Sequence, residues 1–380
     1  MTALPADRPA TRLANRLAFL AAGFCVACWA PLIPFAKARL AVNDAQLGLL
    51  LLCVGVGSLL AMPITGLLSA RIGSRSMILL GGVGMGVLLP VLAVGATPVV
   101  MGGALLLFGA SLGTLDVAMN AHAVEVEAVA PQPLMSGFHA MYSVGGFAGA
   151  GAMTLLLSLA VAPLPAAIAS GALTLAAVAW AAPSLLSTRH AAADAPFAIP
   201  KGVVLLIAGL CAATFLVEGA MLDWGALLIA HRRLAPVTEG GLGYMLFSIA
   251  MTFGRFTGDA VIARLGPRRV LIGGALVAVA GFVALLATPG GPMALGGFLL
   301  IGLGAANLVP VLFSAAGRQR TMPPPMAIAA VTTTGYAGIL AGPAMVGFVA
   351  QSIGLTAAFW LLAVLMCLPA IFARPATRAG

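Results

Sequence analysis

Long apolar runs, separated by short polar or proline- and glycine-rich breaks, cover almost the whole chain. A helix that crosses a bilayer needs about 20 mainly apolar residues, and charge clusters or Pro/Gly turns mark where such helices end. The pattern therefore predicts an all-α integral membrane protein with twelve transmembrane helices. The predicted spans are 15–37, 46–69, 76–96, 99–121, 135–160, 165–186, 203–230, 241–262, 270–288, 293–315, 327–351 and 355–373.

The second half of this pattern resembles the first at an offset of 193 to 195 residues. Each half contains six predicted helices, so both halves have the same orientation and form a parallel 6+6 repeat. We therefore expect two six-helix bundles, at 1–186 and 203–380, joined by a polar linker at 187–202. The matching segments are ARIGSR (70–75) with ARLGPR (263–268), WAPLIPFAKARL (29–40) with WGALLIAHRRL (224–234), and Tyr142 with Tyr336, each of which precedes a glycine-rich run.

Composition supports a lipid environment. Of the 380 residues, 62% are hydrophobic and 8% are charged, whereas a soluble domain has roughly 25% charged residues. The net charge of +9 lies in short clusters between apolar runs, without the basic face of a nucleic-acid-binding protein, so no nucleic-acid partner is expected. The five cysteines lie inside apolar segments, and Cys25 and Cys28 form a CxxC without a second pair. We therefore expect no metal site and no cofactor.

The basic residues predict the orientation. With the N-terminus in the cytoplasm, 14 Lys and Arg residues fall on the inner side and four on the outer side. Because cytoplasmic loops carry an excess of Lys and Arg, both termini and the 187–202 linker are expected to be cytoplasmic, in a bacterial-type inner membrane.

The turn between the second and third helices carries a recognisable motif. It reads Gly66-Leu-Leu-Ser-Ala70-Arg71-Ile-Gly73-Ser-Arg75. This turn resembles the signature of the major facilitator superfamily, Gly-x-x-x-Asp-Arg-x-Gly-Arg-Arg/Lys, with Ala70 at the place of the aspartate. With the twelve spans and the repeat, the resemblance covers essentially the whole chain.

The resemblance implies a secondary active transporter without catalytic residues. Transporters of this build bind a small solute near the bilayer midplane, between their halves, and alternate access to it. The repeated turns are then expected to control the inner gate. Their residues are Gly66, Arg71, Gly73, Arg75, Arg264, Gly266 and Arg268.

A narrower resemblance lies in the fourth helix, GASLGTLDVAMNAH (109–122), where Asp116 precedes Asn120 by four positions. This arrangement is similar to the fucose permease branch of the superfamily. It implies proton-coupled transport of a sugar or a related polar metabolite.

Charged residues inside spanning helices are the candidate site. An acid at the centre of such a helix costs ~2.5–3.5 kcal/mol on insertion scales, so these residues are expected to face a cavity or a partner. Asp116 is the expected proton-binding group, although a buried hydrogen-bonded cluster between the fourth and fifth helices would also explain it. The candidate proton-coupling and substrate residues are Asp116, Asn120, His139, Tyr142, Glu218 and Asn307.

Other polar and aromatic residues are given structural roles. Arg255 and Asp259 have i,i+4 spacing, which predicts a structural ion pair. Asp223 is expected at the membrane edge, where a solvated acid costs little, so it is not counted among the site candidates. Trp29 and Trp224 are expected to be interfacial anchors, with sugar stacking as the alternative.

Three other functions stay open at this point. The chain could be a proton-coupled exporter of drugs or metabolites, or a receptor with a transporter fold. An intramembrane serine protease would use Ser111, in the pattern GASLG, with His139. For a transporter we expect the bilayer, a small-molecule substrate and protons as partners, and a monomer.

Overall fold

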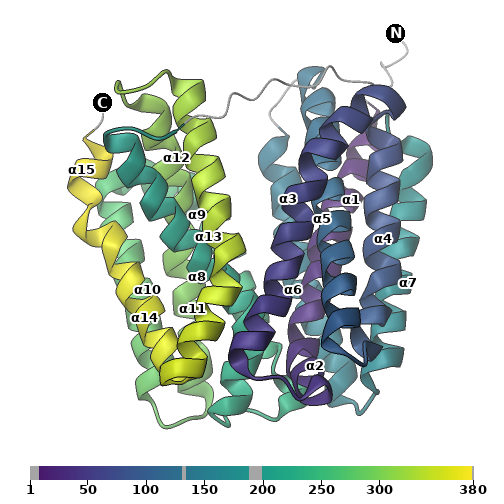
Figure 1. Ribbon diagram of the computed structural model, residues 1–380. Helices are drawn as coiled ribbons and strands as arrows, with labels where there is room; N and C mark the ends of the chain where they lie inside the picture. The colour runs from purple at the N-terminus through teal and green to yellow at the C-terminus, as the bar shows by residue number, and fades with distance from the viewer. Residues whose placement is uncertain (1–7, 131–133, 188–198, 379–380) are drawn as a thin grey trace. The chain divides into compact units, whose positions relative to one another are not determined.

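Every regular element of the described chain is a helix. The computed structural model describes residues 8–130, 134–187 and 199–378, and Figure 1 shows the helices running side by side within each half of the chain. The chain ends and most of the predicted 187–202 linker lie outside the described residues. Eleven described helical segments are long and apolar enough to cross a membrane, and a shorter apolar helix, Leu355–Ile371, completes the predicted twelve.

The contacts divide the chain into two units. Unit 1 comprises Met1–Val42, Cys53–Ala193 and Thr238–Gly241, and unit 2 comprises Asn43–Leu52, Asp194–Val237 and Leu242–Gly380. The helices up to the linker are α1 (Pro9–Trp29), η2 (Ala30–Leu32), α2 (Ile33–Leu40), α3 (Asp44–Ile72), α4 (Ser74–Val94), α5 (Pro98–Ala128), α6 (Met135–Ser158), α7 (Pro163–Ala181) and η3 (Ala182–Ser184).

The helices after the linker follow the same order. They are α8 (Val203–His231), η4 (Val237–Glu239), α9 (Leu242–Leu265), α10 (Pro267–Ala287), α11 (Pro292–Ala305), α12 (Leu308–Arg318), α13 (Pro324–Ile353), α14 (Leu355–Ile371) and α15 (Ala373–Thr377).

The predicted repeat reappears in the packing of α5 on α3 and of α11 on α9. A Cβ on Gly109 would collide with the backbone of Val54, and a Cβ on Gly302 would collide with the backbone of Phe247. Each residue of the second pair lies 193 positions after its counterpart in the first. Small residues let two spanning helices approach closely, so the same glycine performs the same packing task in both units.

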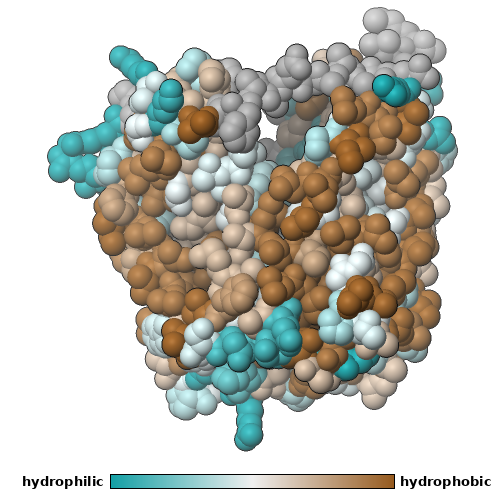
Figure 2. All heavy atoms as spheres, viewed as in Figure 1, coloured by the Kyte–Doolittle hydropathy of each residue, from teal (hydrophilic) through white to brown (hydrophobic). Residues whose placement is uncertain are grey.

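The outer surfaces of the helices are apolar. Figure 2 shows hydrophobic side chains along the helices and hydrophilic ones gathered toward their ends. Leu67, Leu107 and Val364 are each more than half exposed. Such exposure is unfavourable in water and is expected for side chains that contact lipid.

Candidate functional site

Asp116 and Asn120 form a hydrogen-bonded pair on one face of α5. The helix begins with the Thr97 side chain accepting from Val100 N–H at 3.3 Å. Asn120 Nδ2 donates to Asp116 Oδ1 at 3.2 Å and to the Asp116 backbone carbonyl at 2.9 Å. Both side chains are half-buried. Within the described chain, Asn120 is the one residue that hydrogen bonds to the Asp116 carboxylate, and no cation pairs with it.

His139 and Tyr142 lie on α6, as predicted, but the structure places His139 against α1. Its ring meets Phe19 edge to face, with 5.2 Å between ring centres. The side chain of His139 is exposed. The observed aromatic contact is therefore with α1, and a role for His139 beside Asp116 stays a prediction.

Glu218 on α8 pairs with Arg255 on α9, which corrects the expected Arg255–Asp259 pair. Arg255 Nη2 lies 3.4 Å from Glu218 Oε2, and the structure describes no ion pair for Asp259, whose side chain is exposed. The Glu218 side chain is 15% exposed, so its carboxylate gains more from a cation than the solvated Asp259 does. The other carboxylate oxygen, Oε1, is buried without a hydrogen-bond partner.

Tyr244, which is not among the candidates predicted from the sequence, lies near this ion pair. Its hydroxyl is close to the Ser248 side chain and within electrostatic range of Glu218, Arg255 and Asp223, the last of which was expected at the membrane edge. A polar group at the start of α9 thus lies near the acids of α8. No spacing rule within one helix could have brought these residues together.

Asn307 lies where its span is interrupted, between α11 and α12. Its Nδ2 donates to the Gly254 carbonyl of α9 at 2.9 Å. A broken helix inside a membrane is tolerated when other groups satisfy the freed backbone. The Asn307 amide therefore links this interruption to α9, and its role as a substrate or proton-coupling residue stays a prediction.

The two predicted gating turns have the same backbone. Gly73 has φ 87° and ψ 156° before α4, and Gly266 has φ 80° and ψ 156° before α10. Positive φ favours glycine, which explains why both turns carry it. In the described part of the chain, Arg71, Arg75, Arg264 and Arg268 make no hydrogen bond or ion pair, and a Cβ on Gly66 would meet nothing within 4 Å.

The arginines that do bind helix ends are Arg39 and Arg232, which sequence analysis counted only as outer charges. Arg39 donates to the carbonyls of Leu92 at 2.8 Å and Gly95 at 3.0 Å, at the end of α4. Arg232 donates to the carbonyls of Leu285 and, at 2.8 Å, Thr288, at the end of α10. Every member of this second set lies 193 positions after its counterpart, a signal that was present in the sequence. A cation at a helix C-terminus is favourable, so each unit holds its third spanning helix by the same contact, here called the arginine clamp.

His122, also missed, fixes the chain after α7. Its ring is fully buried; Nε2 accepts from Leu186 N–H at 2.9 Å, and Nδ1 lies 3.0 Å from Asn15 Oδ1. Because Nε2 accepts, the ring proton is assigned to Nδ1, which donates to Asn15. Ser74 Oγ donates to the Leu186 carbonyl at 3.1 Å, so both backbone groups of Leu186 are held by side chains.

The tryptophans differ from the expected interfacial anchors. Trp29 is 3% exposed and Trp224 is fully buried, and both indole N–H groups lack a partner. The low exposure of both indole rings fits packing between helices better than contact with lipid head groups or a sugar. Tyr336 instead stacks on Phe215 with ring centres 6.2 Å apart.

Ser111 is engaged within its own helix. Its hydroxyl donates to the Leu107 carbonyl at 2.8 Å, a bond that is common for serine in spanning helices. The described residues contain no cluster of three or more His, Cys, Asp or Glu side chains that could hold a metal ion.

These features define a class: a helical integral membrane protein with an internal repeat and a few charged groups inside its spans. The sequence profile of the Major Facilitator Superfamily matches residues 17–320. The chain therefore belongs to the Major Facilitator Superfamily of membrane transporters, which points to a non-enzymatic role.

Relatives extend the match over nearly the whole chain. An uncharacterized MFS-type transporter of Yersinia pestis is 47% identical over 368 residues, covering 97% of this chain and 96% of that protein. The membrane protein MosC of Rhizobium meliloti is 32% identical and covers 89% of this chain and 83% of its own.

Among solved structures, the chain is similar to a mutant of the nucleoside transporter NupG, with a TM-score of 0.74, 14% identity, and coverage of 97% of this chain and 99% of that one. A bacterial homolog of the human lysosomal transporter Spinster, in an inward-facing and occupied conformation, gives a TM-score of 0.70 at 15% identity, covering 98% and 96%. At these identities the likeness shows the fold.

Proposed function

We propose that this protein is a proton-coupled secondary transporter that moves a small polar solute, a sugar or a related metabolite, by alternating access. Family membership supports transport, and the resemblance of Asp116 and Asn120 to the fucose permease branch supports the substrate class. The observation that carries the coupling is the Asp116 carboxylate. It lies inside an apolar spanning helix with an amide partner and, in the described chain, no cation.

The geometry suits a group that gains and loses a proton. In a low-dielectric site the charged form of a carboxyl group is disfavoured. A change in its hydrogen-bond partner therefore strongly alters the free-energy difference between the charged and protonated forms. Asn120 Nδ2 donates both to the carboxylate and to the Asp116 backbone carbonyl. The backbone bond keeps the amide in place when the carboxylate becomes neutral, so Asn120 stays positioned to contact substrate in both charge states.

The decisive experiment replaces Asp116 by Asn in proteoliposomes. Asp116→Asn mimics the protonated state, so it should retain substrate-for-substrate exchange while losing uphill accumulation driven by an imposed pH gradient. Asp259→Asn is the matched control, since it also exchanges an acid for its amide, at an exposed residue that makes no ion pair in the described chain. Uphill accumulation by Asp116→Asn at the wild-type level would refute the coupling role, and Glu218 would be tested next.

The bundles at 1–186 and 203–380 would move as two bodies, with both termini and the 187–202 linker in the cytoplasm of a bacterial-type inner membrane. The excess of basic residues on that side supports this orientation. A reporter fused after Gly380 should be active in the cytoplasm, and activity confined to the periplasm would reverse the topology. A monomer, measured by light scattering in detergent, is the expected assembly.

A further inference from the structure

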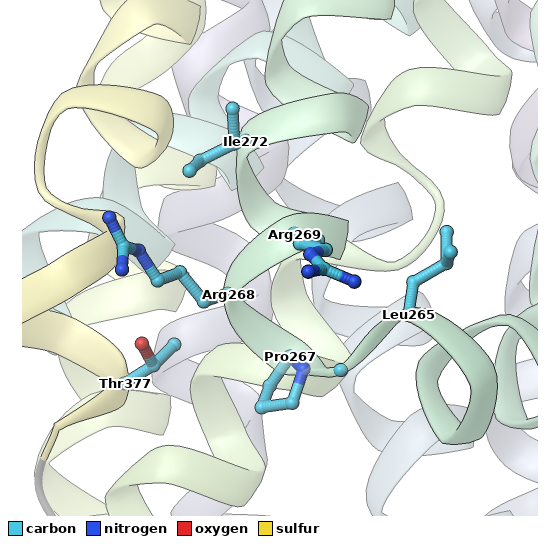
Figure 3. A pocket seen from close by; sticks show the side chains of 7 residues that line it. Leu265, Pro267, Arg268, Arg269, Ile272 and Thr377 are labelled. Atoms are coloured by element: carbon cyan, nitrogen blue, oxygen red, sulfur yellow. The ribbon is translucent and has the colours of Figure 1, made fainter.

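A second candidate site lies at the corner of unit 2 where α9 turns into α10. An open surface pocket of about 470 Å³ lies there, lined by Leu265, Gly266, Pro267, Arg268, Arg269, Ile272 and Thr377. It contains neither Asp116 nor Glu218, so the proposed proton coupling does not use it, although Gly266 and Arg268 also belong to the predicted gating turn. Figure 3 shows Arg268 reaching toward the ribbon that carries Thr377, while Arg269 projects in a different direction from the same turn of α10.

This corner of unit 2 carries exposed basic side chains. Arg268 and Arg269 are exposed, and in the described part of the chain neither makes an ion pair or a hydrogen bond. From residue 242 to the end of the chain, Asp259 is the one acidic residue, against eight arginines. Two of those arginines, Arg374 and Arg378, lie within and directly after α15, the helix that supplies Thr377.

Part of the lining of this pocket is apolar. Leu265, Pro267 and Ile272 line it together with the two arginines, and Leu265 is 50% exposed. A ligand that matches this lining carries a negative group next to an apolar part. Basic pockets between spanning helices at the membrane surface are suited to anionic lipid head groups.

The equivalent corner of unit 1 is built differently. At the equivalent positions, 193 residues earlier, Arg75 corresponds to Arg268. The other two positions differ, because Ser76 corresponds to Arg269 and Ser74 to Pro267. The Ser74 hydroxyl donates to the Leu186 carbonyl, so the chain itself packs over this helix start. The second arginine is therefore particular to unit 2, which argues for a task beyond fixing the turn.

We propose that Arg268 and Arg269 bind the phosphate of an anionic phospholipid, with the glycerol and upper acyl chain against Leu265, Pro267 and Ile272. Arginine presents a planar fork of donors that matches phosphate oxygens. Each basic residue near an anionic lipid surface strengthens association about fivefold. The lipid would anchor the α9–α10 turn to the membrane surface.

The test uses the full-length protein in detergent with added phosphatidylglycerol or phosphatidylcholine. Phosphatidylglycerol should raise the melting temperature more than phosphatidylcholine, and native mass spectrometry should show a retained phosphatidylglycerol. The variant Arg268→Gln/Arg269→Gln should lose this preference, with apparent affinity lowered by at least about tenfold. Arg75→Gln, the matched change in unit 1, should keep it.

Three results would overturn the proposal. These are equal effects of the two lipids on the wild type, an unchanged preference in the double variant, and equal stabilisation by inorganic phosphate alone, which would indicate a free-anion site. Should the double variant not fold, the salt dependence of phosphatidylglycerol binding by the wild type tests the proposal instead. The effect of phosphatidylglycerol must weaken between low and high ionic strength, and a preference that ignores salt contradicts a charge-based site.

Discussion

Units 1 and 2 share their helix packing and differ in their charges. Gly109 and Gly302 pack against backbone at equivalent places, Gly73 and Gly266 make the same turn, and the arginine clamp occurs in both. The chemistry-bearing groups do not repeat. Positions 193 residues apart carry Asp116 and Val309, Cys25 and Glu218, and Met62 and Arg255.

This difference has a physical cause. Close approach of two helices leaves no room for a Cβ, so both units must keep the same glycine wherever they keep the same packing. A charge inside a spanning helix is costly, so it is retained only where it does something. The comparison therefore separates the groups that build the bundles from those that serve transport, and the variants below test that separation.

The largest effect is expected at the packing glycines. Gly109→Ala and Gly302→Ala should each destabilise the protein by about 1–3 kcal/mol or more, because the added methyl group collides with backbone that cannot move aside. Thermal unfolding in detergent measures this.

Matched controls are available on the same helices. Gly103 and Gly296 also lie 193 positions apart, and a Cβ on either would meet nothing within 4 Å. Gly103→Ala and Gly296→Ala should leave stability unchanged or raise it by up to about 1 kcal/mol, because alanine is the better helix former. Equal losses at all four positions would show that the glycines act through backbone flexibility instead.

The next effect concerns the charge pair of unit 2. Arg255→Met should destabilise by about 1–3 kcal/mol, since it leaves the Glu218 carboxylate without its cation. Adding Glu218→Gln to that variant should recover part of the loss, because unit 1 carries neutral Cys25 and Met62 at these positions. If the loss of stability in the double variant equals the sum of the losses in the two single variants, the pair is not coupled.

The arginine clamps should give smaller and similar losses in the two units. Arg39→Gln and Arg232→Gln each remove a charged donor from a helix C-terminus, which is worth about 0.5–1.5 kcal/mol at a partly exposed site. Arg233→Gln, at the exposed neighbour, is the control and should have no effect on the melting temperature. A loss confined to one unit would break the proposed equivalence.

The smallest effect on stability is expected at the repeated turns, where Arg71 and Arg264 make no hydrogen bond or ion pair in the described chain. Arg71→Gln/Arg264→Gln should leave the melting temperature near that of the wild type, yet lower transport if these turns gate the inner side. Substrate affinity measured from the outer side should be largely unchanged. Normal transport at matched protein levels would reduce the turns to topology anchors.

The helices, the repeat and the glycine turns could be predicted from the amino-acid sequence alone. Apolar runs of spanning length are unambiguous because lipid demands them, and the breaks at Gly73 and Gly266 follow from the conformation that glycine permits. The bend at Asn307 and the Asp116–Asn120 pair were also predictable, since the first marks an interrupted span and the second depends only on the spacing within one helix.

Which side chains meet across helices could not be predicted and became visible in the packed molecule. Arg255 is four positions from Asp259 but pairs with Glu218 of α8, and Arg39 reaches the carbonyls of α4. Trp29 and Trp224 are buried where hydropathy suggested an interface. Spacing along the chain describes one helix surface, whereas the partner of a long side chain depends on which neighbouring helix offers an unsatisfied carbonyl or carboxylate, and that follows from how the helices pack.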